Sequence, residues 1–294
     1  MAKETTKATA PPKDLSAYSI KKTNPVVKVI IYILLAIWTI INLFPLYWMF
    51  TFSLKTNPEI YGINVIGLPK EWHWEFYGLA MQRVNMLKLF GNSLLIAVAS
   101  IAITIVVSLM ATYALTRLVW KGSKLMNSFF MLGLTIPLHA ALVPLFKAIK
   151  LVGLYDTYWA LIIPYSAFSL AMAILICTGF MGEIPKDLDE AAYIDGCGVW
   201  GIFIRIIVPL MTPALATIGI YTFLQCWNEF MFASNFTSKL KTIPVGVQTF
   251  FGQHTTDWGI VGAALVIATF PTLLIYVFLS RKIQESFMAG AIKG

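Results

Sequence analysis

Charged residues are scarce in this sequence. Only 12% of its 294 residues are Asp, Glu, Lys or Arg, whereas 58% are hydrophobic, and the mean hydropathy is +0.75. A soluble globular protein carries about 25% charged residues. The shortage of charge therefore excludes an ordinary soluble domain and predicts an integral membrane protein, in which chain length is a poor guide to domain number.

Motifs that mark common catalytic and cofactor sites are also missing. The sequence has no GxxxxGK[ST] P-loop, no HExxH zinc motif and no GxSxG nucleophile motif. Its three cysteines, Cys177, Cys197 and Cys226, are scattered and odd in number, so they fit neither a disulfide framework nor a metal-ligand spacing. We therefore expect no metal and no cofactor in this chain, and a membrane enzyme is poorly supported.

Six apolar stretches are long enough, or nearly so, to cross the roughly 30 Å hydrocarbon core as helices. They are residues 26–52, 92–115, 125–148, 159–181, 213–233 and 260–280. The sequence therefore predicts an all-α integral membrane protein with six transmembrane helices, its transmembrane domain covering 26–284. A polar, disordered tail is expected over 1–25 and a short tail over 285–294.

The distribution of positive charge predicts the orientation. Lys and Arg collect in cytoplasmic loops, and the short loop 116–124 holds Arg117, Lys121 and Lys124 without an acid. With six spans, this places both termini in the cytoplasm of a multi-pass plasma-membrane protein. The net charge of +8 is explained by the same bias. Nucleic-acid binding is not indicated, because the sequence has no basic face interleaved with aromatic residues.

The predicted cytoplasmic loop over 183–209 goes against this bias, because it gathers acids. They are Glu183, Asp187, Asp189, Glu190 and Asp195. Asp187 and Glu190 resemble a capping box, and Gly196 fits the left-handed position that ends a helix. The sequence therefore predicts a short helix over 187–195, which must pack against something because an isolated helix of this length is unstable.

The faces of this short helix suggest an interface. Leu188, Ala191, Ala192 and Asp195 share a side at helical spacing. The paired alanines allow close approach of another backbone, and the acids suit a basic partner. Pro209 then helps to redirect the chain into the fifth span. The alternative on these residues alone is a solvated connecting helix.

The stretch EAAYIDGCGVWGIFIRIIVPL resembles the EAA motif of permease subunits of binding-protein-dependent ABC importers, with Val208 in place of the usual leucine before the proline. Further segments resemble carbohydrate-importer permeases of the maltose-permease G-like type. They are GNSLLIAVAS, IPLHAALVPLFKAIKLVGLYDTYWALIIPY, WNEF, TIPVGVQTF and FMAGAIKG. The resemblance covers roughly residues 24–294.

The resemblance implies a type I ABC importer permease fold, with the EAA loop as a cytoplasmic coupling helix between spans 4 and 5. It implies uptake of a carbohydrate, in particular an oligosaccharide. The implied partners are a second homologous permease in a heterodimer, an ABC ATPase dimer that binds ATP and Mg²⁺, and an extracytoplasmic solute-binding protein. The implied ATPase-coupling residues are Glu190, Ala191, Ala192, Asp195, Gly196 and Pro209.

Four residues are candidates for the substrate path. Glu229 is the only acid inside a predicted span, about 24 Å along the helix from Pro213, and an intramembrane carboxylate is a functional hypothesis by default. Its neighbours Trp227 and Asn228 share the WNEF segment. His139 lies between two prolines that should kink the third span. The alternative is that Glu229 is paired with backbone or with the partner subunit, and that His139 is structural.

A second class of transporter remains open at this point. An ion-gradient-driven secondary transporter would also have several apolar spans. Such proteins usually show repeated halves and ionisable residues near the midplane. Neither feature is evident here, because no internal repeat is apparent and Glu229 lies off-centre.

Overall fold

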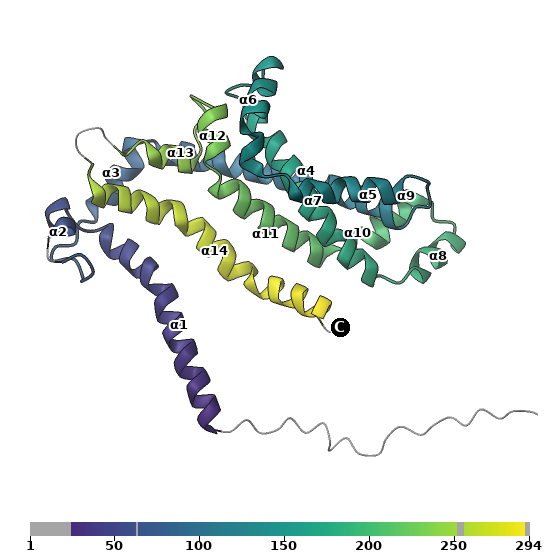
Figure 1. The fold of residues 1–294 in the computed structure, drawn as a ribbon, viewed down its shortest axis with the longest axis horizontal. Coiled ribbons are helices and arrows are strands. Elements are labelled where there is room, and N and C mark those ends of the chain that lie inside the picture. The colour runs from purple at the N-terminus through teal and green to yellow at the C-terminus, as the bar shows by residue number, and fades with distance from the viewer. Residues whose placement is uncertain (1–24, 63, 252–255, 292–294) are drawn as a thin grey trace, which may run out of the picture. The chain divides into compact units, whose positions relative to one another are not determined.

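A computed structural model describes residues 25–62, 64–251 and 256–291, with side chains as far as residue 278. All regular elements in these ranges are helices (Figure 1), so the expectation of an all-α protein is confirmed. The chain forms two compact units, residues 1–48 and 49–294, which are described separately. The tail predicted over residues 1–25 lies outside the described residues except for Pro25.

The first predicted span is the helix α1 (Pro25–Phe52). Between residues 25 and 48 every side chain except Leu46 is exposed, although most of them are apolar. An apolar helix with this exposure is long enough to cross a bilayer and suits contact with lipid or with another apolar helix.

Three more helices are long and apolar enough to cross a membrane. They are α4 (Met86–Thr116), α7 (Trp159–Glu183) and α14 (Trp258–Ala291). Two bent helix pairs also pass this test among the described residues, so the protein has four such helices, or six if each pair counts as one span. Helix α14 continues to Ala291, through the predicted domain boundary at residue 284.

The third predicted span is bent by 94°. Its first part is α5 (Ser123–Leu132) with the 3₁₀ turn Gly133–Thr135, and its second part is the turn Leu138–Ala141 with α6 (Leu142–Leu151). The backbone is extended at Ile136 and Pro137, because a proline disfavours helical geometry in the residue before it. The predicted kink is thus confirmed, and it interrupts the helix.

The fifth predicted span, residues 213–233, is interrupted near residue 229. Helix α11 (Thr212–Asn228) stops at Glu229, whose backbone is extended, and the chain restarts as α12 (Met231–Phe236). At its other end, α11 follows a segment from Val199 to Leu210 at an angle of 71°. Periodicity alone could not show the break, because the apolar pattern runs on through it.

Helix α4 is the centre of the larger unit and packs mainly against α7 and α11. Its buried face carries small hydroxyl side chains at four-residue spacing: Ser100, Thr104, Ser108 and Thr112. Without a hydrophobic driving force between helices in lipid, small residues promote association by letting backbones approach closely. This face explains how α4 packs closely against both neighbours.

Short helices cover one end of the larger unit (Figure 1). They are α2 (Asn57–Tyr61), α3 (Glu75–Arg83) and α13 (Ile243–Gln248), while α8 (Asp187–Ile194) lies at the opposite end. At the α2 end, the buried Lys55 donates to the carbonyls of Asn64 and Val65 at 2.8 and 3.3 Å. Burial lowers the pKa of Lys55, and nearby Glu59 partly offsets that effect.

Asp156 ties together two loops that are distant in sequence. Its carboxylate accepts hydrogen bonds from the backbone N–H groups of Ser238, Lys239 and Leu240 at 2.8 to 3.1 Å. Burial acts to raise the pKa of Asp156, but these hydrogen bonds lower it to about 2. The carboxylate is therefore ionised at neutral pH and holds the loop after α6 to the loop after α12.

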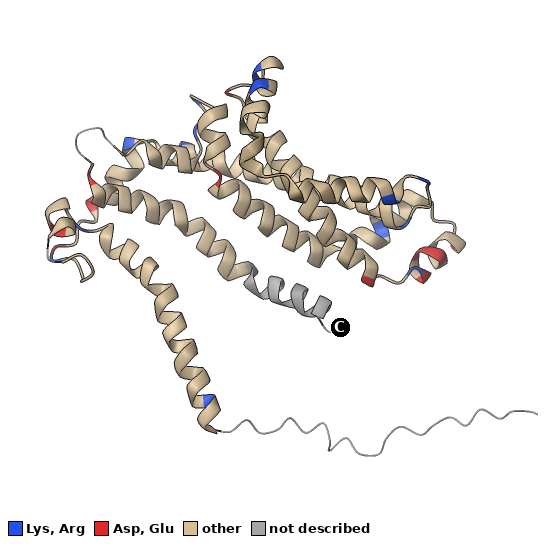
Figure 2. Cartoon of the chain, in the orientation of Figure 1, with Lys and Arg blue, Asp and Glu red and all other residues tan. Residues whose placement is uncertain are grey.

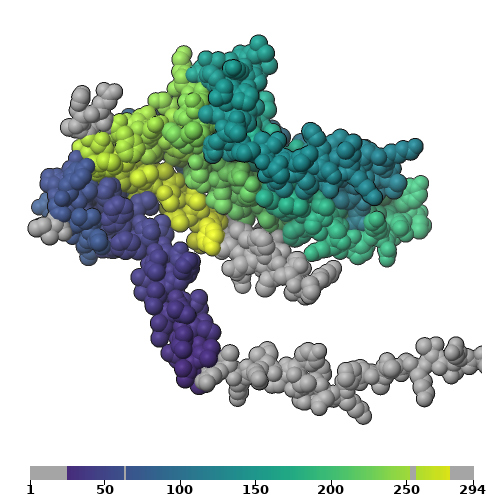
Figure 3. All heavy atoms as spheres, viewed as in Figure 1, coloured from purple at the N-terminus to yellow at the C-terminus, as the bar shows by residue number. Residues whose placement is uncertain are grey.

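Helices α6 and α12 stand side by side above the rest of the larger unit (Figure 3). Phe146 of α6 stacks on Phe236 of α12 with ring centroids 6.1 Å apart, and Lys150 lies over the Phe146 ring. These contacts and those of Asp156 join the two helices into one protrusion. Helix α6 is the last part of the third predicted span, and α12 begins near the end of the fifth.

Candidate functional site

The short helix predicted in the acidic loop is α8 (Asp187–Ile194). It begins without a side-chain cap, since Lys186 occupies the N-cap position and no side chain there accepts a backbone hydrogen bond. The predicted capping box of Asp187 and Glu190 is therefore wrong, because Asp187 is already inside the first turn. Acids in that turn still stabilise the helix through its dipole.

The end of α8 matches the prediction. Gly196 has a φ of +84°, in the left-handed region. Its N–H donates to the Tyr193 carbonyl at 3.0 Å, and the N–H of Cys197 donates to the Ala192 carbonyl at 2.9 Å. This pair of hydrogen bonds is the Schellman arrangement, in which glycine is strongly favoured. Gly196 thus fixes where α8 ends.

The exposed face of α8 differs from the predicted one. Ala192 is only 7% exposed and packs in a core cluster with Met181 and Ile202, so it does not lie on the outer surface with Ala191. Tyr193 and Ile194 are 72% and 84% exposed instead. Sequence reasoning missed them, because only the packing of Ala192 shows which side of α8 faces the core.

Acidic side chains surround these exposed apolar residues. Glu190 and Asp195 are exposed beside Ala191, and Figure 2 shows the concentration of acids on α8. The surface of α8 therefore combines two large apolar side chains with negative charge. The sequence predicted the negative charge and Ala191 on this surface but not the exposed Tyr193 and Ile194.

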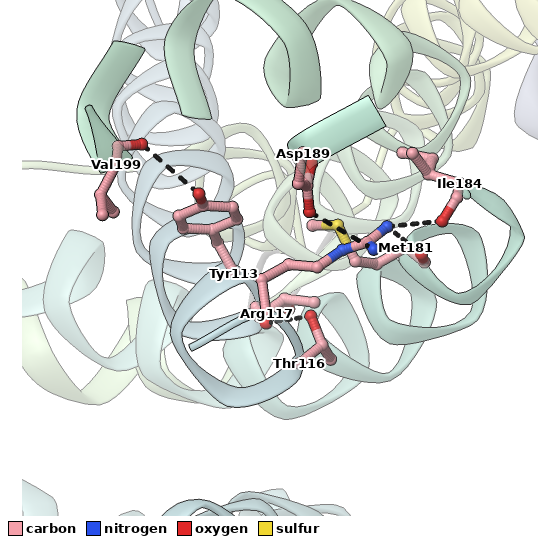
Figure 4. Close-up of polar contacts among 8 residues, drawn as sticks. Tyr113, Thr116, Arg117, Met181, Ile184, Asp189 and Val199 are labelled. Atoms are coloured by element: carbon pink, nitrogen blue, oxygen red, sulfur yellow. Dashed lines mark hydrogen bonds and ion pairs between the residues drawn. The ribbon is translucent and has the colours of Figure 1, made fainter. Parts of the chain in front are cut away.

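Arg117 contacts α8 on its buried side, and the sequence did not predict this contact. Its guanidinium contacts the Asp189 carboxylate, with Nη1 and Oδ2 3.4 Å apart, and donates to the carbonyls of Ile184 and Met181 at 2.6 and 3.1 Å (Figure 4). The Arg117 side chain is 5% exposed and that of Asp189 is 18% exposed. Arg117 is thus a buried structural charge as well as a topology signal.

After α8 the chain runs through α9 (Val199–Ile202), a π-helical turn at Phe203–Ile207 and α10 (Val208–Leu210). Pro209 lies in α10, immediately before the 71° bend into α11. A proline in a first turn needs no N–H partner, so Pro209 fits this position. The predicted change of direction at Pro209 is therefore confirmed.

A cavity of about 280 Å³ lies where α7, α11 and α12 meet the turn before α6. Its polar lining comprises His139, Tyr165, Ser169, Gln225, Asn228 and Glu229. Three of the four residues predicted for a substrate path are therefore brought together. Trp227 does not line this cavity: its indole N–H donates to the Ala268 carbonyl of α14 at 3.1 Å.

The prediction that Glu229 lies inside a helical span is wrong, because Glu229 occupies the break between α11 and α12. Its carboxylate accepts hydrogen bonds from the N–H groups of Phe232 and Ala233 at 2.8 and 3.1 Å. It also accepts one from the Tyr165 hydroxyl at 2.5 Å. These contacts favour the alternative reading, in which Glu229 is a structural group that caps α12 and binds it to α7.

The family model for the binding-protein-dependent transport system inner membrane component matches residues 105–288. This chain belongs to that family. The match includes α8, Arg117 and the whole cavity at Glu229. The protein is thus a multi-pass membrane subunit of a transporter.

Curated relatives cover nearly the whole permease. A probable ABC transporter permease, YurM of Bacillus subtilis, is 35% identical over 90% of this chain and 88% of its own length. The trehalose/maltose transport system permease MalG of Thermococcus litoralis is 36% identical over 87% and 93%. The sulfoquinovosyl glycerol transport system permease SmoH of Agrobacterium fabrum is 35% identical over 86% and 90%.

A solved structure shows the same fold. It is a bacterial ABC transporter involved in the import of the acidic polysaccharide alginate, with a TM-score of 0.77 and 19% identity. The likeness covers 92% of this permease and 99% of that chain. The predicted type I importer permease fold is therefore confirmed.

Proposed function

We propose that this permease takes up a carbohydrate, in particular an oligosaccharide, across the plasma membrane as part of an ATP-driven importer. The observation that carries the proposal is α8, a short helix that ends at Gly196 and exposes apolar and acidic side chains. Relatives named for trehalose/maltose, diacetylchitobiose and sulfoquinovosyl glycerol transport support a sugar substrate.

The proposed complex has four kinds of subunit. A second homologous permease forms a heterodimer with this chain, an ABC ATPase dimer binds ATP and Mg²⁺, and an extracytoplasmic protein delivers the sugar. An alginate transporter has been solved with its oligosaccharide-bound periplasmic protein, which supports the last of these partners. ATP hydrolysis takes place in the ATPase subunits, and this chain is not catalytic.

We further infer that α8 and both termini face the cytoplasm. Arg117, Lys121 and Lys124 cluster at the end of α4 on the same side as α8, and positive charge favours the cytoplasmic side. In this orientation the exposed face of α8 meets the ATPase. Tyr193 and Ile194 enter an apolar cleft, and Glu190 and Asp195 face basic residues at its rim.

Purifying the permease from its native cell in mild detergent tests this assembly. We expect a second permease and a Walker-motif ATPase to accompany it. Ile194→Asp should release the ATPase, because a central interface residue contributes about 2 kcal/mol or more, roughly 30-fold in affinity. Since Ile194 is 84% exposed, the substitution leaves the core intact.

Val119→Asp is the matched control for Ile194→Asp. Val119 is fully exposed in the neighbouring loop. Its substitution therefore introduces the same charge on the surface at a position outside α8. A lone permease, whose transport survives ATP depletion and stops when the ion gradient is collapsed, would establish the secondary transporter instead. Release of the ATPase by Val119→Asp as well would contradict docking through α8.

We also propose that sugar passes the cavity beside Glu229. Asn228, Gln225 and His139 offer hydrogen bonds to sugar hydroxyls, and Phe168 and Phe230 offer aromatic faces. Glu229 shapes this cavity through its contacts with α12 and α7. Trp227 does not line the cavity but joins α11 to α14 through its hydrogen bond to Ala268.

Asn228→Ala is expected to raise the KM for sugar uptake about 5-fold, the effect of losing one hydrogen bond, without changing the amount of assembled complex. Asn235→Ala is the matched control. Asn228 donates to the Leu224 carbonyl at 2.9 Å and Asn235 to the Met231 carbonyl at 2.7 Å, four residues back in each case. Equal KM values for the two variants would remove Asn228 from the substrate path.

A further inference from the structure

Three helix ends meet at the Arg117 guanidinium. Arg117 directly follows α4, it donates to the last carbonyls of α7, and it contacts Asp189 in the first turn of α8 (Figure 4). A cation at a helix C-terminus and an acid at a helix N-terminus are both favoured by the helix dipoles. One side chain therefore joins α8 to the two most extensively packed helices of the protein.

This joint is buried and not fully satisfied. Arg117 Nε and Asp189 Oδ1 have no hydrogen-bond partner among the described residues, although both atoms are buried. The contact of 3.4 Å between Nη1 and Oδ2 is longer than the roughly 2.7–2.9 Å of a strong charged hydrogen bond. A small shift of α8 toward Arg117 would shorten this contact to a charged hydrogen bond between Nη1 and Oδ2.

Helix α7 extends from this joint to the cavity. Tyr165 lies 18 positions before Glu183, about 27 Å along the helix at 1.5 Å per residue. Its hydroxyl donates to Glu229 at the break between α11 and α12. A continuous series of contacts thus runs from Asp189 through Arg117 and α7 to the cavity.

We propose that Arg117 is a positioning residue that transmits the displacement of α8 to α4 and α7, and through α7 to the contact between Tyr165 and Glu229. The pair with Asp189 has two arrangements, the long contact of 3.4 Å between Nη1 and Oδ2 and a shorter charged hydrogen bond between the same atoms, and the ATPase shifts the joint from one to the other. The inference rests on the proposed function, because it takes α8 as the helix that the ATPase moves.

The test compares Arg117→Gln, Asp189→Asn and the double variant in the full transporter complex in proteoliposomes. The sugar is whichever of maltose, trehalose and diacetylchitobiose the wild-type complex transports. We expect the ATPase to remain bound and basal ATP hydrolysis to persist, while sugar transported per ATP falls roughly 3- to 10-fold. The double variant should be no worse than Arg117→Gln, because either change breaks the same pair.

Arg205→Gln is the control, since it removes the same charge from the exposed side of the neighbouring π-helical turn. An unchanged transport-to-ATP ratio in Arg117→Gln, or an equal change in Arg205→Gln, overturns the inference. If Arg117→Gln does not assemble, the nearly isosteric Asp189→Asn carries the test. A wild-type complex without ATPase or sugar uptake would instead refute the proposed function.

A second measurement needs no sugar. Spin labels are placed on exposed positions of α7 and α14, Trp159→Cys and Phe270→Cys, with Cys197 replaced by serine. We expect ATP to change the distance between the labels in the otherwise native complex, and much less so in Arg117→Gln. An undiminished ATP-dependent change in Arg117→Gln, with the ATPase bound, would show that displacement reaches α7 without Arg117.

Discussion

Replacing Gly196 with valine is expected to abolish uptake while the permease still inserts and assembles with the second permease that we propose as its partner. The φ of +84° is unfavourable for any residue with a Cβ, by about 1–2 kcal/mol, and most of all for a β-branched one. A Cβ at Gly196 would meet nothing within 4 Å, so the strain comes from the backbone itself. Relieving it breaks the hydrogen bonds that end α8 and displaces Tyr193 and Ile194.

Comparing Gly196→Val with Gly196→Asn separates the effect of backbone strain from the effect of side-chain size. Asparagine tolerates the left-handed region far better than valine does, so Gly196→Asn should retain more uptake than Gly196→Val. Gly198→Ala is the control, because Gly198 has a φ of −74° and equally open surroundings. Substrate-stimulated ATP hydrolysis and uptake are measured together. Full uptake in Gly196→Val would contradict the role of α8.

The sequence predicted best where a local pattern decides the structure. The turn at Gly196 depends on one backbone conformation, and the break of the third span depends on Pro137. The exposed face of α8 was harder, because two adjacent alanines look alike until the packing of Ala192 against Met181 is known. Local patterns therefore located α8 but did not orient it.

Contacts between distant residues could not be read from the sequence. Arg117 looked like an ordinary positive charge of a cytoplasmic loop, and Asp189 like one acid among several. Only the meeting of α4, α7 and α8 pairs them. Glu229 shows the same limit, since its apolar neighbours continue the helical pattern across the break that its own carboxylate stabilises.

Glu229→Gln is expected to reduce uptake at least tenfold and to lower the melting temperature of the purified complex. The carboxylate accepts three hydrogen bonds, from Tyr165, Phe232 and Ala233. Hydrogen bonds to a charged group contribute about 1.5–3 kcal/mol each. Glutamine keeps one oxygen but turns an NH₂ group toward donors, so at least one of these bonds is lost and α12 loses part of its cap.

Tyr165→Phe removes the link to α7 and leaves the cap of α12 in place. Its effect should be smaller than that of Glu229→Gln, and the double variant should show less than the sum because the residues share one bond. Tyr158→Phe provides the control, since the Tyr158 hydroxyl donates at 2.8 Å to the neutral amide of Asn92. Its loss should cost about 1 kcal/mol.

The two roles considered for Glu229 make opposite predictions in these variants. A structural cap predicts a lower melting temperature and a lower kcat for uptake, with little change in KM. A direct substrate contact predicts a raised KM with unchanged stability, as expected for Asn228→Ala. Because all three bonds at the carboxylate are made within the chain, we expect the first pattern, and a raised KM at full stability would assign Glu229 to the sugar.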